Sequence, residues 1–76
     1  MTNEDFVAYA RVLFGTAWQT AFVEASGVSR RTVTRIVTGE ATVSAQVERA
    51  LAEVAERRLA EVTAVVEAVR TKEHRS

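Results

Sequence analysis

The second half of the chain contains an uninterrupted run from Ser44 to Arg70 without glycine or proline. Both of those residues break helices, and this run is rich in Ala, Val, Glu and Arg, so it favours one long helix or two helices joined with a slight bend. Such a helix would be about 40 Å long, and its apolar residues fall within an arc of roughly 140° on a helical wheel. The apolar residues in this arc are Val47, Leu51, Val54, Ala55, Leu59, Val62, Val65, Val66 and Val69.

The two halves of this predicted helix have different expected roles. The first half, residues 47–54, is expected to close a core with Phe6 and Leu13. The second half repeats apolar residues at spacings of three and four, which is the pattern of a helix-pairing seam. Because the rest of the chain offers this seam no obvious partner, the sequence predicts a homodimer. The predicted dimerisation residues are Leu59, Val62, Val66 and Val69.

Gly15, Gly27 and Gly39 divide the first half of the chain into three shorter predicted helices. These run from about Glu4 to Leu13, from near Ala17 to Gly27, and from Ser29 to about Thr38. Their predicted caps are Thr2 or Asn3, a Thr16–Gln19 capping box, and Ser29. Their predicted buried residues are Phe6, Ala10, Leu13, Trp18, Phe22, Val23, Val33, Ile36 and Val37. The predicted fold class is all-α, with four to five helices in one domain over residues 1–70 and a disordered polar tail at 71–76.

The positive charge of the chain is local, although the formal net charge is zero. Residues 29–39 contain Arg30, Arg31 and Arg35 and no acid, whereas the segments on either side are net negative. Phosphate attraction acts within about 10 Å at moderate salt, so the local patch matters more than the total. The neutral total still predicts weak non-specific binding to nucleic acid.

Composition argues against several classes of protein. The chain has no cysteine, and its single histidine, His74, lies in the polar tail, so we expect no metal centre, no cofactor and no catalytic site. The apolar stretches are too short to span a bilayer and no signal peptide is evident, which predicts a cytoplasmic protein without membrane contact.

Residues 18–39 resemble the helix-turn-helix of the Cro and phage-repressor (XRE-like) family. The resemblance depends on Gln19 opening the first helix, Gly27 and Val28 in the turn, and Gly39 closing the second helix, with Val33 and Ile36 on its buried side. It extends from about Phe6 to Glu53 and implies a helix-turn-helix over about 17–39. The dimerisation helix over about 44–70 is predicted from the apolar spacing described above, not from the resemblance. Val23 departs from the family, which usually has alanine where the two helices cross.

The resemblance also implies roles for individual residues. Family members contact base edges at the positions of Arg30, Arg31, Thr34 and Arg35, and phosphates at those of Gln19, Thr20 and Ser29. The chemistry agrees, because an arginine can bond guanine O6 and N7 with both arms and a helix N-terminus suits a phosphate.

Simpler interpretations exist for each of these residues. The arginines could form only a solvated helix face, and Gln19 and Ser29 could be only helix caps. Trp18 and Phe22 are interpreted as core residues rather than a base-stacking platform. The arginines at 49, 57 and 58 alternate with glutamates, which favours surface ion pairs, and Arg58 could instead extend to the dimer edge.

Together these patterns predict a homodimeric transcriptional repressor that binds double-stranded DNA at a palindromic operator, with recognition helices about 34 Å apart. No small-molecule effector is expected, and autorepression suits such a chain. The resemblance points to a phage or anti-CRISPR-associated regulator. The alternative is a protein-interaction module, antitoxin- or inhibitor-like, in which the long helix binds a partner protein. An enzyme is the least supported class.

Overall fold

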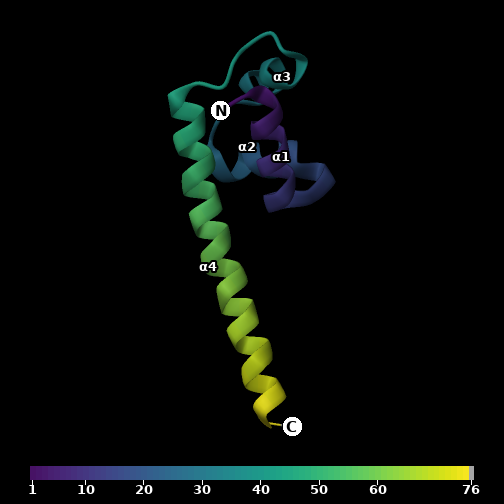
Figure 1. Cartoon of the computed structure of the whole chain (residues 1–76), viewed down its shortest axis with the longest axis vertical. Helices are drawn as coiled ribbons and strands as arrows, with labels where there is room; N and C mark the ends of the chain where they lie inside the picture. Colours follow the sequence, from purple (N-terminus) through teal and green to yellow (C-terminus); the bar gives the residue numbers. More distant parts are fainter. Residues whose placement is uncertain (76) are drawn as a thin grey trace.

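The computed structural model describes residues 1–75, and their side chains up to residue 73. This part of the chain is helical and contains no strand, which confirms the all-α prediction. Three short helices, α1 (Asn3–Phe14), α2 (Trp18–Ser26) and α3 (Arg30–Thr38), precede the long helix α4 (Ala45–Arg75). Figure 1 shows α1, α2 and α3 clustered beside the first half of α4, while its second half projects alone. The molecule is accordingly elongated, measuring 54 × 21 × 20 Å.

Helix α1 begins with a reciprocal cap between Thr2 and Asp5. The Asp5 backbone N–H donates to Thr2 Oγ1 at 3.0 Å, and the Thr2 N–H donates to Asp5 Oδ2 at 3.4 Å. Of the two residues considered as the cap, Thr2 has that role, which leaves the Asn3 side chain free for contacts elsewhere.

The predicted Thr16–Gln19 capping box is wrong. Residues Gly15–Ala17 form a single 3₁₀ turn that leads directly into α2, and the residue before α2 is Ala17, which has no side-chain acceptor. Thr16 is held inside the 3₁₀ turn, so its hydroxyl is not at the position from which a cap reaches the first turn of α2. No side chain caps α2.

The connection between α2 and α3 follows the sequence expectation closely. Gly27 has φ 76°, a left-handed conformation that favours glycine, and its N–H donates to the Val23 carbonyl at 3.1 Å. Ser29 caps α3 by accepting from the Thr32 N–H at 3.1 Å. Gly39, also left-handed at φ 85°, ends α3. Three residues therefore separate the two helices, and each helix end has a local physical cause.

The core lies where α1, α2 and α3 meet the first half of α4. Phe6 is at its centre, with its ring edge-on to Trp18 and to Phe22 at centroid distances of 5.7 and 5.2 Å. The side chains that complete this buried cluster are Ala10, Val33, Ile36, Val47 and Leu51, and Val54 is also buried. The prediction that Val37 is buried is wrong, because α3 turns this side chain outward and leaves it 44% exposed. Val23 and Leu13 are half-buried against the core.

Helix α4 is one unbroken helix of 31 residues, so the alternative of two joined helices is wrong. It continues past Arg70 through Thr71–Arg75, which corrects the prediction of a disordered tail there; Ser76 lies outside the described residues. No glycine or proline interrupts this segment, and the Thr71 hydroxyl donates to the Glu67 carbonyl at 2.8 Å within the helix. Within residues 1–75, no helix is both long and apolar enough to cross a membrane.

Candidate nucleic-acid interface

Helix α3 has one buried and one exposed side. Val33 and Ile36 are fully buried against the core. The residues predicted to contact bases lie on the other side, and all four are exposed: Arg30, Arg31, Thr34 and Arg35. Because Ser29 caps the helix and Gly39 ends it, this set is presented on a short, well-bounded helix.

Arg30 connects the exposed side of α3 to the start of α2. One of its terminal guanidinium nitrogens donates to Thr20 Oγ1 at 3.2 Å, and both side chains are exposed. Thr20 lies in the first turn of α2, whose N-terminus has no side-chain cap. The structure therefore brings a predicted base-contacting residue and a predicted phosphate-contacting residue together, next to a helix N-terminus suited to an anion.

The two other predicted phosphate-contacting residues differ in availability. The Ser29 hydroxyl accepts from the Thr32 N–H and lies 2.8 Å from the Thr32 hydroxyl, so the capping interpretation of Ser29 is confirmed. Gln19 is half-buried, and the structure records no hydrogen bond from its side chain to another described residue. Gln19 sits beside Thr20 in the first turn of α2, near the same surface.

Glu40 reduces the positive charge of this surface. The Arg35 Nε lies 3.8 Å from Glu40 Oε2, and both side chains are at least half exposed. Glu40 lies one residue beyond segment 29–39, which contains no acid, so the arginines are not wholly unopposed. An exposed pair of this kind contributes little and is readily exchanged. Arg31 has no such partner among the described residues.

Sequence reasoning missed the residue that holds the far end of α3. The Asn3 side-chain amide donates one hydrogen bond to the Ile36 carbonyl at 3.0 Å and another to the Ala41 carbonyl at 2.8 Å. These bonds link the start of α1 to the last turn of α3 and the loop that follows. An asparagine at the start of a helix normally indicates a cap, so nothing in the local sequence distinguished this longer-range role.

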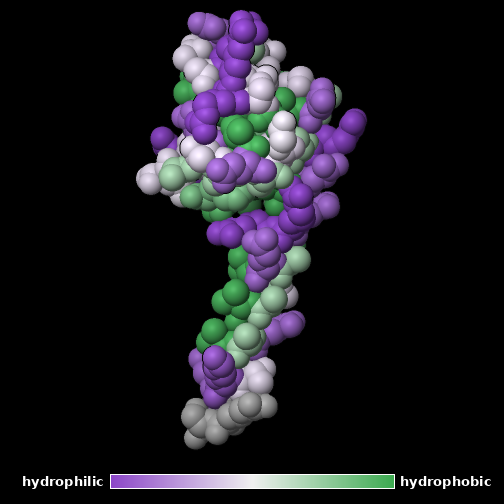
Figure 2. Space-filling view, turned by 180° about the vertical axis from the view of Figure 1, so that it is seen from behind, coloured by the Kyte–Doolittle hydropathy of each residue, from purple (hydrophilic) through white to green (hydrophobic). Residues whose placement is uncertain are grey.

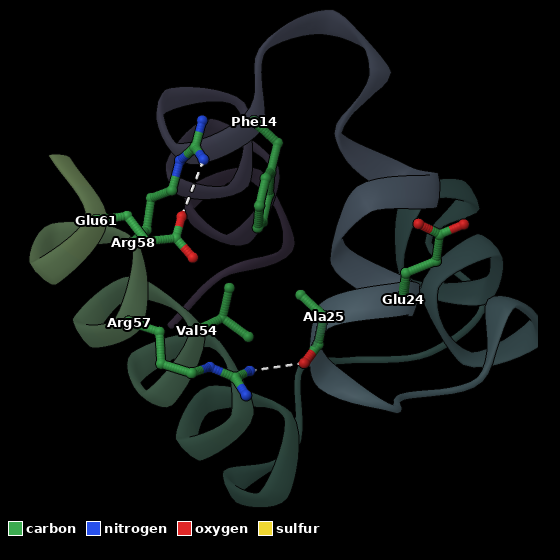
Figure 3. A pocket seen from close by; sticks show the side chains of 7 residues that line it. All are labelled: Phe14, Glu24, Ala25, Val54, Arg57, Arg58 and Glu61. Carbon is green, nitrogen blue, oxygen red and sulfur yellow. Dashed lines mark hydrogen bonds and ion pairs between the residues drawn. The ribbon is translucent and has the colours of Figure 1, made fainter. Parts of the chain in front are cut away.

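A hollow of about 360 Å³ lies between α2 and α4 (Figure 3). At its edge Arg57 donates to the Ala25 carbonyl at 2.6 Å, which satisfies a backbone acceptor near the C-terminus of α2. Arg58 pairs with Glu61 at 3.2 Å and lies over the Phe14 ring, 5.9 Å from its centroid. The predicted surface ion pair is thus present for Arg58, whereas Arg57 links α4 to α2 through its hydrogen bond to the Ala25 carbonyl. Both arginines have structural contacts here rather than being poised for a ligand.

The N-terminus is also attached to α4. The α-amino group of Met1 lies 2.9 Å from Glu48 Oε1, and this hydrogen bond, with the negative charge of Glu48, raises the pKa of the amine above its ordinary value. Within the described residues, no group of three or more histidine, aspartate or glutamate side chains is placed to hold a metal ion.

The residues predicted to form the dimer seam lie on the projecting half of α4. Leu59 is 67% exposed, and Val62, Val66 and Val69 are each close to half exposed. Figure 2 shows hydrophobic side chains gathered along this part of the helix.

Comparison with known protein families, curated proteins and solved structures finds no match to this chain. The family resemblance and the dimer therefore stay predictions.

Proposed function

We propose that this chain is a sequence-specific double-stranded DNA-binding protein of the helix-turn-helix type, acting as a homodimeric repressor at an inverted-repeat operator. The observation that carries the proposal is the shared surface formed by the exposed side of α3 and the first turn of α2, joined by the bond between Arg30 and Thr20. In this proposal α3 enters the major groove and the first turn of α2 meets the backbone.

The residue chemistry supports this division of roles. Arg31 and Thr34 are exposed and have no side-chain partner among the described residues, so no existing interaction must be broken before they reach a base edge. Arg35 would exchange only a long, exposed pair with Glu40. Arg30, held near Thr20, is placed to share a phosphate with that hydroxyl or to reach the first base of a half-site. The sequence resemblance makes an XRE-like regulator from a phage or an anti-CRISPR locus the natural source of such a protein.

The test is a mobility-shift titration on the DNA upstream of the protein's own gene, with excess unrelated DNA present. The double variant Arg31→Ala/Arg35→Ala should bind at least about 30-fold more weakly, because each arginine on a base edge is worth about 1–3 kcal/mol. Arg11→Ala/Arg49→Ala is the matched control, since it removes the same charge from exposed positions on α1 and α4. The control should retain nearly full affinity.

Two outcomes would overturn the proposal. Equal loss in the test and control variants would mean that binding depends only on overall charge. Absence of any shift, both on the upstream DNA and after selection from random DNA, would exclude sequence-specific binding by a protein shown to be folded.

The association constant for the operator should also fall steeply between about 50 and 200 mM salt, because contacts to phosphates release counterions.

The exposed apolar stripe on α4 supports a second candidate, a module that binds a partner protein. In that case the stripe from Leu59 to Val69 is the working surface, and the arginines of α3 contribute only solubility. The double variant Arg31→Ala/Arg35→Ala would then keep full function in cells, while a charge at Val62 or Val66 would abolish it.

A further inference from the structure

A continuous apolar groove runs between α1 and α4 and adjoins the hollow of Figure 3 at Arg58, which lines both. Two adjoining hollows of about 320 and about 330 Å³ share Val12, Leu13 and Ala55 in their walls. At one end the groove reaches Tyr9 and Leu51, and at the other it opens onto Leu59 and Val62. Val12 is 85% exposed and Tyr9 51% exposed, so the groove presents apolar surface that the chain itself leaves uncovered.

We infer that this groove and the stripe beyond it are covered by a second copy of the chain, whose α4 runs antiparallel to the first. This inference deepens the homodimer of the proposed function but does not depend on DNA binding. The shape of the surface favours the antiparallel arrangement. The projecting half of α4 is a single convex helix, and in an antiparallel pair it lies towards the concave groove of the other copy. A parallel pair would set one groove against the other, leaving space between two concave surfaces.

The spacing of the apolar residues defines a register. Leu59, Val62, Val66 and Val69 alternate at three and four residues, as in the seam of a two-helix coiled coil. A twofold axis near residue 64 sets Val62 against Val66 of the second copy, and Leu59 against Val69 of the second copy. The same relation holds in reverse, so the pair is closed and self-complementary, as a symmetric dimer requires.

Charge distinguishes the two orientations. Glu56 and Arg70 flank the seam on the same edge, both are exposed, and the structure records no ion pair between either residue and another described residue. In the antiparallel register Glu56 lies beside Arg70 of the second copy, and this favourable pair occurs twice. A parallel register instead sets Arg70 beside Val65 and Arg58 beside Thr63, and forms no pair of opposite charges at these positions.

One kind of like-charged approach accompanies this register, and by symmetry it too occurs twice. Arg58 comes near Lys72 of the second copy, on the other edge of the seam. Arg58 is already paired with Glu61 at 3.2 Å and drawn over the Phe14 ring, so its charge is opposed within its own chain. Glu61 is held beside Arg58 and can attract the approaching lysine as well. The repulsion between Arg58 and Lys72 therefore does not cancel the attraction between Glu56 and Arg70.

A charge-swap experiment tests the orientation. Glu56→Arg alone and Arg70→Glu alone each set like charges against one another twice, and each should weaken self-association roughly tenfold. The double variant Glu56→Arg/Arg70→Glu should restore the wild-type constant. The two residues are about 21 Å apart along one helix, so rescue cannot arise within a chain. Glu53→Arg, which makes the same charge change at an exposed position about 160° around α4 from the seam, is the matched control. Dissociation constants come from sedimentation equilibrium, and circular dichroism verifies helicity.

Disulfide formation gives an independent readout, because the chain has no cysteine. A mixture of the separate variants Glu56→Cys and Arg70→Cys should form covalent heterodimers on mild oxidation, while neither variant alone does so. Val69→Cys should not crosslink to itself, since the two copies of residue 69 are about 15 Å apart along the axes.

Three outcomes would overturn the inference: a monomeric wild-type mass at high concentration, efficient self-crosslinking of Val69→Cys, or failure of the double swap to rescue. A monomeric mass would leave the groove to a different partner. None of these measurements uses DNA, and Arg31→Ala/Arg35→Ala should keep the dimer intact. Failure of the pairing and failure of DNA recognition are therefore separable.

Discussion

Replacement of Asn3 by alanine should destabilise the protein by about 2 kcal/mol. The Asn3 amide donates two hydrogen bonds, to the Ile36 carbonyl at 3.0 Å and to the Ala41 carbonyl at 2.8 Å, and both are partly buried. A hydrogen bond of this kind contributes about 1 kcal/mol net, and losing two gives the stated sum. The Ile36 carbonyl still accepts from the Gly39 N–H, so the larger share of the loss falls on the Ala41 carbonyl.

The measurement is urea unfolding followed by circular dichroism, at one fixed protein concentration because self-association contributes to stability. For a domain of this size, about 2 kcal/mol corresponds to a fall in Tm of roughly 8–16 °C. Glu4→Ala, an exposed neighbour in the same helical turn, is the control for helix propensity and should change the free energy of unfolding by at most about 0.5 kcal/mol.

Asn3→Asp separates the two possible origins of a loss. Aspartate has nearly the same shape as asparagine and suits the first turn of a helix, but its carboxylate cannot donate to the two carbonyls. It should therefore remain destabilised by more than about 1 kcal/mol. Full wild-type stability in Asn3→Asp would refute the reasoning, because the alanine effect would then arise from the helix terminus rather than from the bonds to α3 and its loop.

Two further predictions concern the attachment of α4. Arg57→Met should lower the free energy of unfolding by about 1 kcal/mol, measured by urea denaturation, because the bond to the Ala25 carbonyl is lost while most of the aliphatic stem is kept. Glu48 raises the pKa of the Met1 amine in the folded state. The contact between them therefore contributes fully to the free energy of unfolding below the unfolded pKa near 8, and this contribution is lost as the pH rises through the folded pKa. Wild type should therefore lose more stability than Glu48→Gln in thermal melts taken on either side of that range; parallel pH profiles would argue against the contact.

Local signals in the sequence account for most of the fold. Gly15, Gly27 and Gly39 mark the three helix ends correctly, and each adopts a positive φ, where glycine avoids the steric cost of a side chain. The core follows from helical spacing, because Phe6 and Phe22 have to face inward if the polar faces are to stay in water. These features depend on residues a few positions apart, which is the range over which a sequence pattern is informative.

The errors arose where contacts between distant segments decide the structure. Val37 is apolar but α3 is too exposed to bury three residues, and Thr16 was drawn into a 3₁₀ turn by the short path from α1 to α2. The bonds of Asn3 and Arg57 span more than thirty residues and leave no local trace. In the candidate interface, helical spacing alone predicts which α3 residues are exposed. The contact of Arg30 with Thr20 depends in addition on the angle at which α2 and α3 pack, and no local pattern gives that angle.

The projecting half of α4 has a consequence for the length of an operator. The three short helices lie beside the first half of α4, with α3 near its N-terminal end (Figure 1). In an antiparallel pair centred near residue 64, the two Ala45 ends are about 57 Å apart at 1.5 Å per residue. That span exceeds the single DNA turn of about 34 Å expected from the sequence and is closer to two turns, about 68 Å. Helix α4 would thus serve as a molecular ruler, and each heptad added between the head and the seam would lengthen the distance between half-sites by about 21 Å.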